Sequence, residues 1–200
     1  KADAYSLLGN VYLELKRYSD AICFVNELLE ITPYSRGWWL KKINIYKQMG
    51  NFQEAERALK RLYQIYPNDT EIGRAYNDVM IGDGYEAIRN KKYDEANQIY
   101  KTIIDNNPSN KEAYQGIIAN EMMKGSKENA LQFTERALLE LKDDLSLVEK
   151  KIGLLVELGR HGEAITYIRS LDRAKFPTVY SKTLPYVMQE TAVFSQYNDS

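Results

Sequence analysis

The sequence predicts an all-α fold in which helical hairpins follow one another along the chain and stack side by side. Glycine (11) and proline (5) are scarce among the 200 residues, so little of the chain is free to form turns. A short fragment with alanine at its centre recurs five times. Prolines recur with the same period, as expected where helices end.

The repeated alanines define the period of the chain. They are separated by 34, 41, 34 and 34 residues and are Ala21, Ala55, Ala96, Ala130 and Ala164. The matching prolines are Pro33, Pro67 and Pro108, each 12 residues after its alanine, and Pro177, which comes one residue late. A unit of this length holds two helices and their turns. The small alanine side chain lets two helices approach closely where they cross.

Each copy is expected to form a first and a second helix. In the second copy we expect the first helix at about 37–49, ended by Gly50, and the second at about 53–65, ended before Pro67. Apolar residues at helical spacing give the expected core face of the second helix. In the second copy this face is Ala55, Ala58, Leu59, Leu62 and Tyr66, and in the first copy it is Ala21, Phe24, Val25, Leu28 and Leu29.

The spacing of 41 residues contains seven more residues than the others, which is close to two helical turns. It predicts one lengthened helix over 70–89, with Thr70 as its N-cap and Glu71 as its first-turn acid. Gly82 and Gly84 would each weaken this helix by about 1 kcal/mol relative to alanine. We therefore expect a break near residues 81–84, either as an irregular connection or as a hinge or projecting surface that partners use.

The residues after Pro177 do not complete a sixth copy. Residues that fit one helical face there are Tyr180, Leu184, Val187, Met188 and Thr191. We expect residues 178–200 to form a C-terminal capping helix that seals the last hairpin, or else the start of a following region. Pro185 is expected either to kink this helix or to mark its first turn.

Several residues carry a resemblance to a known family. In the first copy, Tyr5, Leu8, Gly9, Tyr12, Ala21 and Pro33 stand at the aromatic, Leu, Gly, Tyr, Ala and Pro points of the tetratricopeptide repeat, and the second copy keeps Trp39, Tyr46, Gly50, Ala55 and Pro67. The chain therefore resembles the tetratricopeptide repeat family over about residues 1–177. It departs from the family where Ile43, Ile118 and Ile152 replace a small residue and where Lys42 and Lys151 replace Leu. These first helices are expected to pack more widely than usual.

The resemblance implies a right-handed α-α superhelix, a solenoid of five hairpins plus the C-terminal helix. Its repeats are expected at about 2–35, 36–69, 70–110, 111–144 and 145–177. First helices would line the concave face, where amide, cationic and apolar side chains suit an extended peptide. The residues expected in this groove are Asn10, Lys41, Asn44, Gln48, Tyr85, Arg89, Gln115 and Met122.

The predicted function is a protein–protein interaction scaffold that binds an extended peptide or a partner helix in this groove, as part of a larger protein or assembly. Because the sequence begins at Lys1 rather than Met, we expect it to be a piece of a longer chain. The alternative is a repeat domain attached to an enzymatic, regulatory or outer-membrane barrel domain that has been removed, as bacterial proteins similar to this one often show. The expected compartment is the periplasmic side of the cell envelope or the cytoplasm.

Other partners are not expected. The formal net charge is −1, and the charge alternates between copies, so the cluster of Arg57, Lys60 and Arg61 does not predict binding of nucleic acid. No run reaches the roughly 18 apolar residues that a membrane-spanning helix needs. One subclass of the family grips the C-terminal carboxylate of heat-shock chaperones. The matching positions are Ser6, Asn10, Lys41, Asp78 and Gly82, of which only Asn10 agrees, so we predict no such binding.

No catalytic, metal-binding or cofactor-binding residue is expected. The single histidine, His161, stands where other copies carry aromatic residues, and we interpret it as a packing residue. The single cysteine, Cys23, stands where other copies carry polar residues, on the outer face of its helix. Asp143 and Asp144 are expected to form a solvated turn and an N-cap rather than a pair of catalytic carboxylates.

Overall fold

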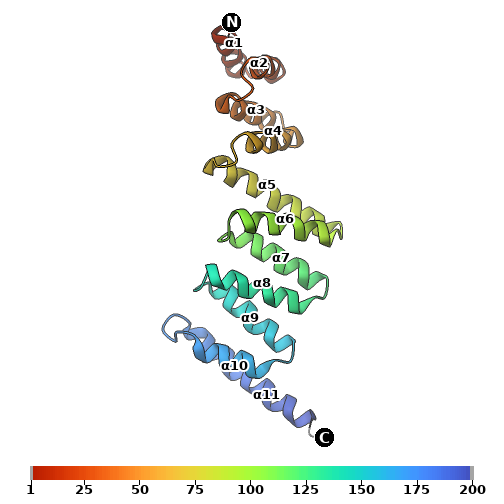
Figure 1. Ribbon diagram of the computed structural model, residues 1–200, viewed down its shortest axis with the longest axis vertical. Coiled ribbons are helices and arrows are strands. Elements are labelled where there is room, and N and C mark those ends of the chain that lie inside the picture. The colour runs from red at the N-terminus through yellow and green to blue at the C-terminus, as the bar shows by residue number, and fades with distance from the viewer. Residues whose placement is uncertain (1, 199–200) are drawn as a thin grey trace. The chain divides into compact units, whose positions relative to one another are not determined.

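The computed structural model describes the backbone of residues 2–198 and the side chains of residues 7–192 (Figure 1). Over residues 2–198 the chain consists of helices and turns and contains no strand, so the predicted all-α fold is confirmed. The chain divides into two compact units, Lys1–Val79 and Met80–Ser200, and each is described by itself.

The first unit contains two helical hairpins and the beginning of a fifth helix. Its helices are α1 (Ala2–Glu14), α2 (Tyr18–Ile31), α3 (Arg36–Gln48), α4 (Phe52–Ile65) and the first half of α5 (Thr70–Arg89). The second unit contains the rest of α5, then α6 (Tyr93–Asn106), α7 (Lys111–Met123), α8 (Lys127–Glu140), α9 (Leu145–Glu157), α10 (His161–Ser170), a π-helical turn (Val179–Thr183) and α11 (Leu184–Asn198).

The five repeated alanines lie inside the hairpins. None of them is more than 3% exposed, which confirms that their methyl groups face the core. Each stands in the first turn or just after it in a second helix: α2, α4, α6, α8 or α10. A larger side chain there would push the paired helices apart and strain the core.

Two clusters fill the core of the first unit. One joins Ala21, Val25 and Leu29 of α2 to Ile45 of α3, so α3 packs against the helix before it as well as against its own partner. The other joins α3, α4 and the start of α5 and consists of Ile43, Ala55, Ala58, Leu59, Leu62 and Ile72. The clusters contain most of the expected core faces of the second helices. Leu28 is also buried, outside both clusters, whereas Phe24 and Tyr66 are only half-buried.

One cluster runs through the second unit, from Ala87 in α5 to Val187 in α11. Tyr100 and Tyr114 are its largest fully buried side chains. Each helix that stacks on the cluster covers apolar surface that a single hairpin would leave in water, which is how repeat arrays stabilise themselves.

The residues that depart from the family pattern are accommodated in these cores. The three isoleucines at the small-residue position, Ile43, Ile118 and Ile152, are all buried. The lysines at the leucine position lie over aromatic rings: Lys42 Nζ is 5.2 Å from the ring centre of Trp39, and Lys151 Nζ is 4.3 Å from that of Tyr167. Burial lowers the pKa of Lys42. The lysine stem thus covers apolar surface while its ammonium meets the face of a ring.

Helix α5 is continuous from Thr70 to Arg89, which confirms the predicted long helix, whereas the break expected near residues 81–84 is wrong. Packing of its apolar residues in both cores outweighs the low helix propensity of its glycines. The expected N-cap is also wrong, because Asp69 caps the helix in place of Thr70. Asp69 Oδ1 accepts the backbone N–H groups of Glu71 and Ile72, each at 3.0 Å.

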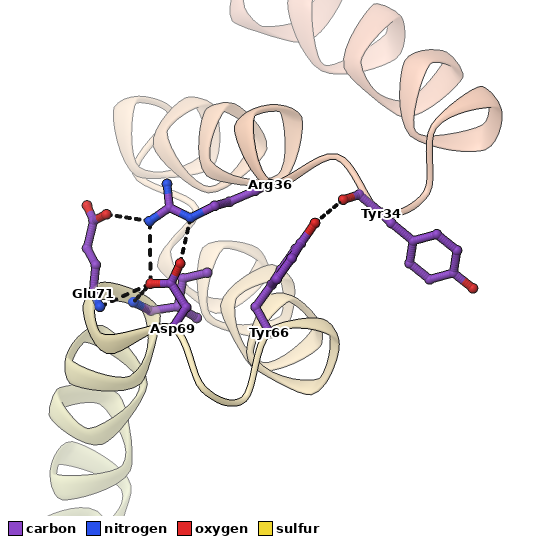
Figure 2. A network of polar contacts seen from close by, with 6 residues as sticks. Tyr34, Arg36, Tyr66, Asp69 and Glu71 are labelled. Carbon is purple, nitrogen blue, oxygen red and sulfur yellow. Dashed lines mark hydrogen bonds and ion pairs between the residues drawn. The ribbon is translucent and has the colours of Figure 1, made fainter.

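A network of polar contacts ties the start of α3 to the start of α5 (Figure 2). Arg36 Nε donates to Asp69 Oδ2 at 2.7 Å, and the Arg36 Nη2 group donates to Glu71. The hydrogen bonds from Arg36 hold the pKa of Asp69 below its usual value. The carboxylate that caps α5 therefore also binds the first residue of α3.

The turn before α3 is fixed by two aromatic side chains. The indole Nε1 of Trp39 donates to the carbonyl oxygen of Pro33 at 2.8 Å. The hydroxyl group of Tyr66 donates to the carbonyl oxygen of Tyr34 (Figure 2). Both hydrogen bonds satisfy backbone carbonyl groups that lie in a turn and therefore receive no hydrogen bond from a helix.

The C-terminal segment begins with the π-helical turn and continues directly into α11. Pro185 follows the π-helical turn inside a helical segment that is unbroken from residue 177 to 198, so it does not mark the start of this helix. A proline ring cannot donate a backbone hydrogen bond and crowds the preceding turn, which favours a widened turn before it. Val179 and Val187 are buried, and the hydroxyl group of Tyr180 donates to the carbonyl oxygen of Leu171 at 2.8 Å.

Candidate functional site

The predicted groove residues of the first unit lie on α1 and α3. Lys41 Nζ donates to Asn10 Oδ1, and it lies 4.5 Å from the ring centre of Trp38. Asn44 and Gln48 are exposed on α3, three and seven residues after Lys41, so the three share one side of the helix. This side presents one cation and several amides next to an indole ring.

Two predicted groove residues of the second unit lie at the end of α5. Tyr85 and Arg89 are exposed and one helical turn apart. The Tyr85 ring meets that of Tyr100 edge to face, with the ring centres 6.1 Å apart. Tyr85 therefore contacts the buried Tyr100 while about half of the residue (49%) stays exposed to solvent.

The other two predicted residues, Gln115 and Met122, line a cavity between α7 and α9. Its volume is about 470 Å³, and most of its wall is apolar. The lining residues are Gln115, Ile118, Ala119, Met122, Met123, Ser146, Leu147 and Lys150. We call this the α7–α9 cavity. Flexible, polarizable methionines on one wall adapt to apolar side chains of different shape.

The two helices that form this cavity are tied together at their N-termini. Lys111 Nζ, in the first residue of α7, lies 2.6 Å from Asp144 Oδ2, and Asp144 Oδ1 caps α9 by accepting the N–H of Leu147 at 3.1 Å. Burial raises the pKa of Asp144, but the hydrogen bonds from Lys111 and from the backbone outweigh it, so this pKa is lowered. The contact repeats the one between Arg36 and Asp69 in the first unit.

A second cavity lies on the other side of α9, against the π-helical turn and α11. Its volume is about 340 Å³. The lining residues are Glu149, Ile152, Gly153, Val156, Glu157, Thr183, Tyr186 and Val187. We call this the α9–α11 cavity. The sequence did not single out any of its residues for binding, although a glycine in the middle of a helix was a visible signal.

A smaller cavity of about 280 Å³ lies between α4 and the first half of α5. Phe52 at its edge is 68% exposed, whereas His161, at the same point of the last copy, is buried. The apolar floor is formed by Ala55, Leu59 and Val79. Phe52 is therefore not the packing residue that its place in the repeat suggests.

A buried polar network joins α6, α7 and α8, and the sequence did not predict it. Glu121 is 1% exposed, and its two carboxylate oxygens accept hydrogen bonds from the amides of Asn97 and Asn129. The neighbouring Asn120 donates to the carbonyl oxygen of Tyr93 and to Asn97 Oδ1, each at 2.8 Å. A buried carboxylate with a donor on each oxygen fixes how the three helices fit together.

The residues considered for catalysis or metal binding lie in a packing position, on an exposed helix face and in a capped turn. His161 is buried, with Nδ1 3.2 Å from the carbonyl oxygen of Gly159, and this confirms a packing position. Cys23 is exposed, as expected for the outer face of α2. Asp144 is the expected N-cap of α9, and Asp143 lies in the turn with its carboxylate 2.6 Å from Lys175 Nζ.

Among the side chains that the structure describes, no group of three or more His, Cys, Asp or Glu could hold a metal ion. None of the helices within the described part of the chain is both long and apolar enough to cross a membrane. Two residues of the sequence interpretation, Tyr5 and Ser6, lie outside the residues whose side chains are described.

The basic cluster of α4 is balanced by polar groups of its own helix. Arg57 pairs with Glu54, Lys60 pairs with Glu56, and Arg61 Nη1 donates to Gln64 Oε1 at 3.0 Å. The two ion pairs reduce the positive charge that the helix presents, whereas the neutral amide of Gln64 leaves the charge of Arg61 unchanged. The prediction that the chain does not bind nucleic acid stays a prediction, and a weak, salt-independent retention on RNA or DNA would agree with it.

Comparison of the sequence with family models supports a repeat architecture over residues 2–79. Two family models described as tetratricopeptide repeat match residues 2–35 and 36–79. No curated protein matches the sequence. Among solved structures, the MamA protein is 15% identical, with 90% of this chain and 94% of that chain covered and a TM-score of 0.48. The pilF protein of Pseudomonas aeruginosa is 15% identical (98% and 89% covered, TM-score 0.46), and the P58(IPK) TPR domain is 13% identical (98% and 66% covered, TM-score 0.42).

Proposed function

We propose that this chain, a member of the tetratricopeptide repeat family through residues 2–79, is a non-enzymatic scaffold that binds a peptide segment of a partner protein on its first helices. The observation that carries the proposal is the α7–α9 cavity. It is open, mostly apolar and large enough for one or two apolar side chains, and it lies on two first helices of consecutive hairpins.

The polar groups at the edge of this cavity suit a peptide backbone. Gln115 brings an amide that both donates and accepts hydrogen bonds, and Lys150 brings a donor. Met122 and Met123 offer adaptable apolar contact. Backbone hydrogen bonds combined with pockets for individual side chains are the usual way in which peptides are held. Whether the first unit binds peptide through Lys41 and Asn44 is a separate prediction.

A selection from a library of short random peptides, carried out on the full chain, tests the proposal. We expect enriched peptides that carry large apolar residues. Ala119→Glu places a charge in the cavity at an exposed helix position, and it should weaken these peptides by about tenfold or more. Leu139→Glu is the matched control, because Leu139 is 70% exposed on the second helix α8 and lies outside the cavity.

Both variants should keep the circular dichroism spectrum of the original chain, since both positions are exposed. Equal weakening by Ala119→Glu and Leu139→Glu would show that peptides bind by unspecific apolar contact. Failure of the original chain to enrich any peptide would exclude this peptide-binding role.

A further inference from the structure

We infer that the outer face of α1 is a docking surface for an amphipathic helix of a partner protein, which packs on it as α2 packs on α3. This face consists of Leu7, Leu8 and Val11 of α1 and of Leu15 directly after it. The surface is separate from the α7–α9 cavity, so the inference does not depend on the proposed function. It specifies the partner helix by a pattern: alanine at one position and larger residues four and eight positions later.

The outer face of α1 is an apolar row in contact with solvent. Leu7, Val11 and Leu15 are spaced four positions apart. The backbone N–H of Leu15 donates to the carbonyl oxygen of Val11 at 3.0 Å, so the row lies along one side of a continuous helical path. Each of the four residues, Leu8 included, is between 42% and 68% exposed. Single exposed apolar residues are normal on a protein surface, whereas a contiguous row indicates a contact surface.

The point of the repeat at which Val11 stands is covered in other hairpins. It lies ten residues before the repeated alanine, and the helices α3, α7 and α9, which have the same length as α1, carry Ile45, Asn120 and Leu154 there. None of these three residues is more than 1% exposed. The exposure of Val11 is therefore an exception to what this position does elsewhere in the molecule.

The covering element is a second helix of the preceding hairpin. Ile45 shares a core cluster with Ala21, Val25 and Leu29 of α2. Asn120 donates hydrogen bonds to α6, and α9 packs on α8. A helix that covers the outer face of α1 would therefore continue an interface that the chain already forms between its own hairpins.

The second helices that precede another hairpin share one pattern. In α2, α4, α6 and α8 the repeated alanine is followed by buried or half-buried residues four and eight positions later, which are Val25 and Leu29, Leu59 and Tyr63, Tyr100 and Ile104, and Thr134 and Leu138. This stripe meets the next helix: the Tyr63 ring stacks on that of Tyr76 in α5, with the centres 4.1 Å apart. The small alanine lets the helices approach, and the two larger residues fill the space between them.

The same pattern decides between the possible occupants. A second folded copy could not present any of these four stripes, because each is already used inside its own chain. In α10 the pattern stops after Ala164 and Ile168, since Asp172 stands at the third position. Side chains of an extended peptide alternate between two sides, whereas the spacing of Leu7, Val11 and Leu15 matches one side of a helix. The occupant is therefore a helix of another protein.

The probe is a synthetic peptide with the sequence of α4, residues 52–65, which contains the pattern and no cysteine. Its binding to the full chain is measured by fluorescence anisotropy. The helical circular dichroism signal should increase on binding, because an isolated helix of 14 residues is only marginally stable in water. The same peptide with Leu59→Asp should bind at least about tenfold more weakly, since it would bury a charge.

Val11→Asp in the full chain should also weaken the α4 peptide by about tenfold or more. Leu139→Asp is the matched control, because Leu139 is an equally apolar, exposed residue on α8. If Val11→Asp changes the circular dichroism spectrum of the chain, Leu7→Asp tests the same face at its more exposed edge. Ala119→Glu, which tests the proposed function, should leave binding of the α4 peptide unchanged.

Three results would overturn the inference. The first is no binding of the α4 peptide, or equal binding by the original chain, Val11→Asp and Leu7→Asp. The second is binding without any gain of helical signal, which would identify an extended peptide as the occupant. The third is a dimer in analytical ultracentrifugation that Val11→Asp dissociates, which would identify a second copy of this chain.

Discussion

The ring of Tyr100 lies directly on the backbone of Gly116, so that a Cβ on Gly116 would stand 2.3 Å from the Cζ atom of Tyr100. On its other side the same ring approaches Gly84, where a Cβ would stand 2.6 Å from Cζ. Tyr100 is on α6, while the two glycines are on α5 and α7. A side chain of one helix is thus clamped between the backbones of its two neighbours, and burial raises the pKa of its hydroxyl group.

Gly116→Ala should destabilise the protein, although alanine has the higher helix propensity. The added methyl group overlaps a ring that has no room to move, and overpacking of this kind costs about 1–3 kcal/mol. A lower free energy of unfolding in urea would agree with the clamp. The double variant Gly116→Ala with Tyr100→Leu should recover part of the loss, and no recovery would mean that the ring is not the cause.

Tyr100→Phe should leave the fold unchanged and raise its stability by about 1 kcal/mol. The reason is that the Tyr100 hydroxyl is buried and has no hydrogen-bond partner among the described residues. Removing a buried polar group without a partner removes its desolvation cost. Thermal unfolding of the two proteins compares them directly. A clearly less stable phenylalanine variant would reveal a partner of the hydroxyl group, such as a bound water molecule.

Asp144→Asn should lower the free energy of unfolding at neutral pH by about 1 kcal/mol. It should also make the free energy of unfolding depend less on pH in the acidic range. The pKa of Asp144 is lowered in the folded state, so its stabilising effect is complete above the unfolded value of 3.8 and is lost as the pH falls through the lower folded value. Asparagine can still cap α9 but cannot pair with Lys111. Urea unfolding measured from neutral pH to below about pH 4 follows the loss.

The control for this experiment is Asp143→Asn, which changes the adjacent but exposed carboxylate that pairs with Lys175. Exposed ion pairs contribute little, so its acid profile should match that of the original chain. Similar profiles for the Asp143 and Asp144 variants would contradict the special contribution of the capped pair.

Lys41→Glu combined with Asn44→Ala tests the groove of the first unit. The pair removes the cation that binds Asn10 and one exposed amide on the same side of α3. Acidic peptides that bind the first unit should dissociate, while the helical spectrum should remain, since neither side chain is part of the core. Peptides that still bind equally well would locate their site elsewhere.

The fold could be predicted because its signals are local and repeated. The alanine at the helix crossing recurs in all five copies, and a proline follows the second helix in four of them. An error of one residue in the register of a copy would therefore have put these markers out of phase. The start of α5 was missed because both Asp69 and Thr70 are good capping residues, and the choice depends on Arg36, which is distant in sequence. Continuity of α5 through Gly82 was missed because core packing decides it.

The candidate site was less predictable because a cavity is defined by what several helices leave empty. Gln115 and Met122 follow from the register of α7 alone, whereas the contribution of Lys150 depends on how α9 lies beside α7. The network around Glu121 needs three helices at once. The sequence indicated it only as a carboxylate at the point where the first two copies carry Tyr12 and Tyr46.

Helix α5 has a practical consequence for dissecting the molecule. Its Ile72 and Val79 pack in the core of the first unit, and its Ala87 packs in the core of the second. A cut after residue 79 would leave each core its own residues, but it would divide α5 in the middle and remove half of its helical hydrogen bonds from each fragment. A fragment ending at Arg89 and a fragment starting at Thr70 would each carry the shared helix whole, so overlapping fragments of this kind suit a separate study of the two units.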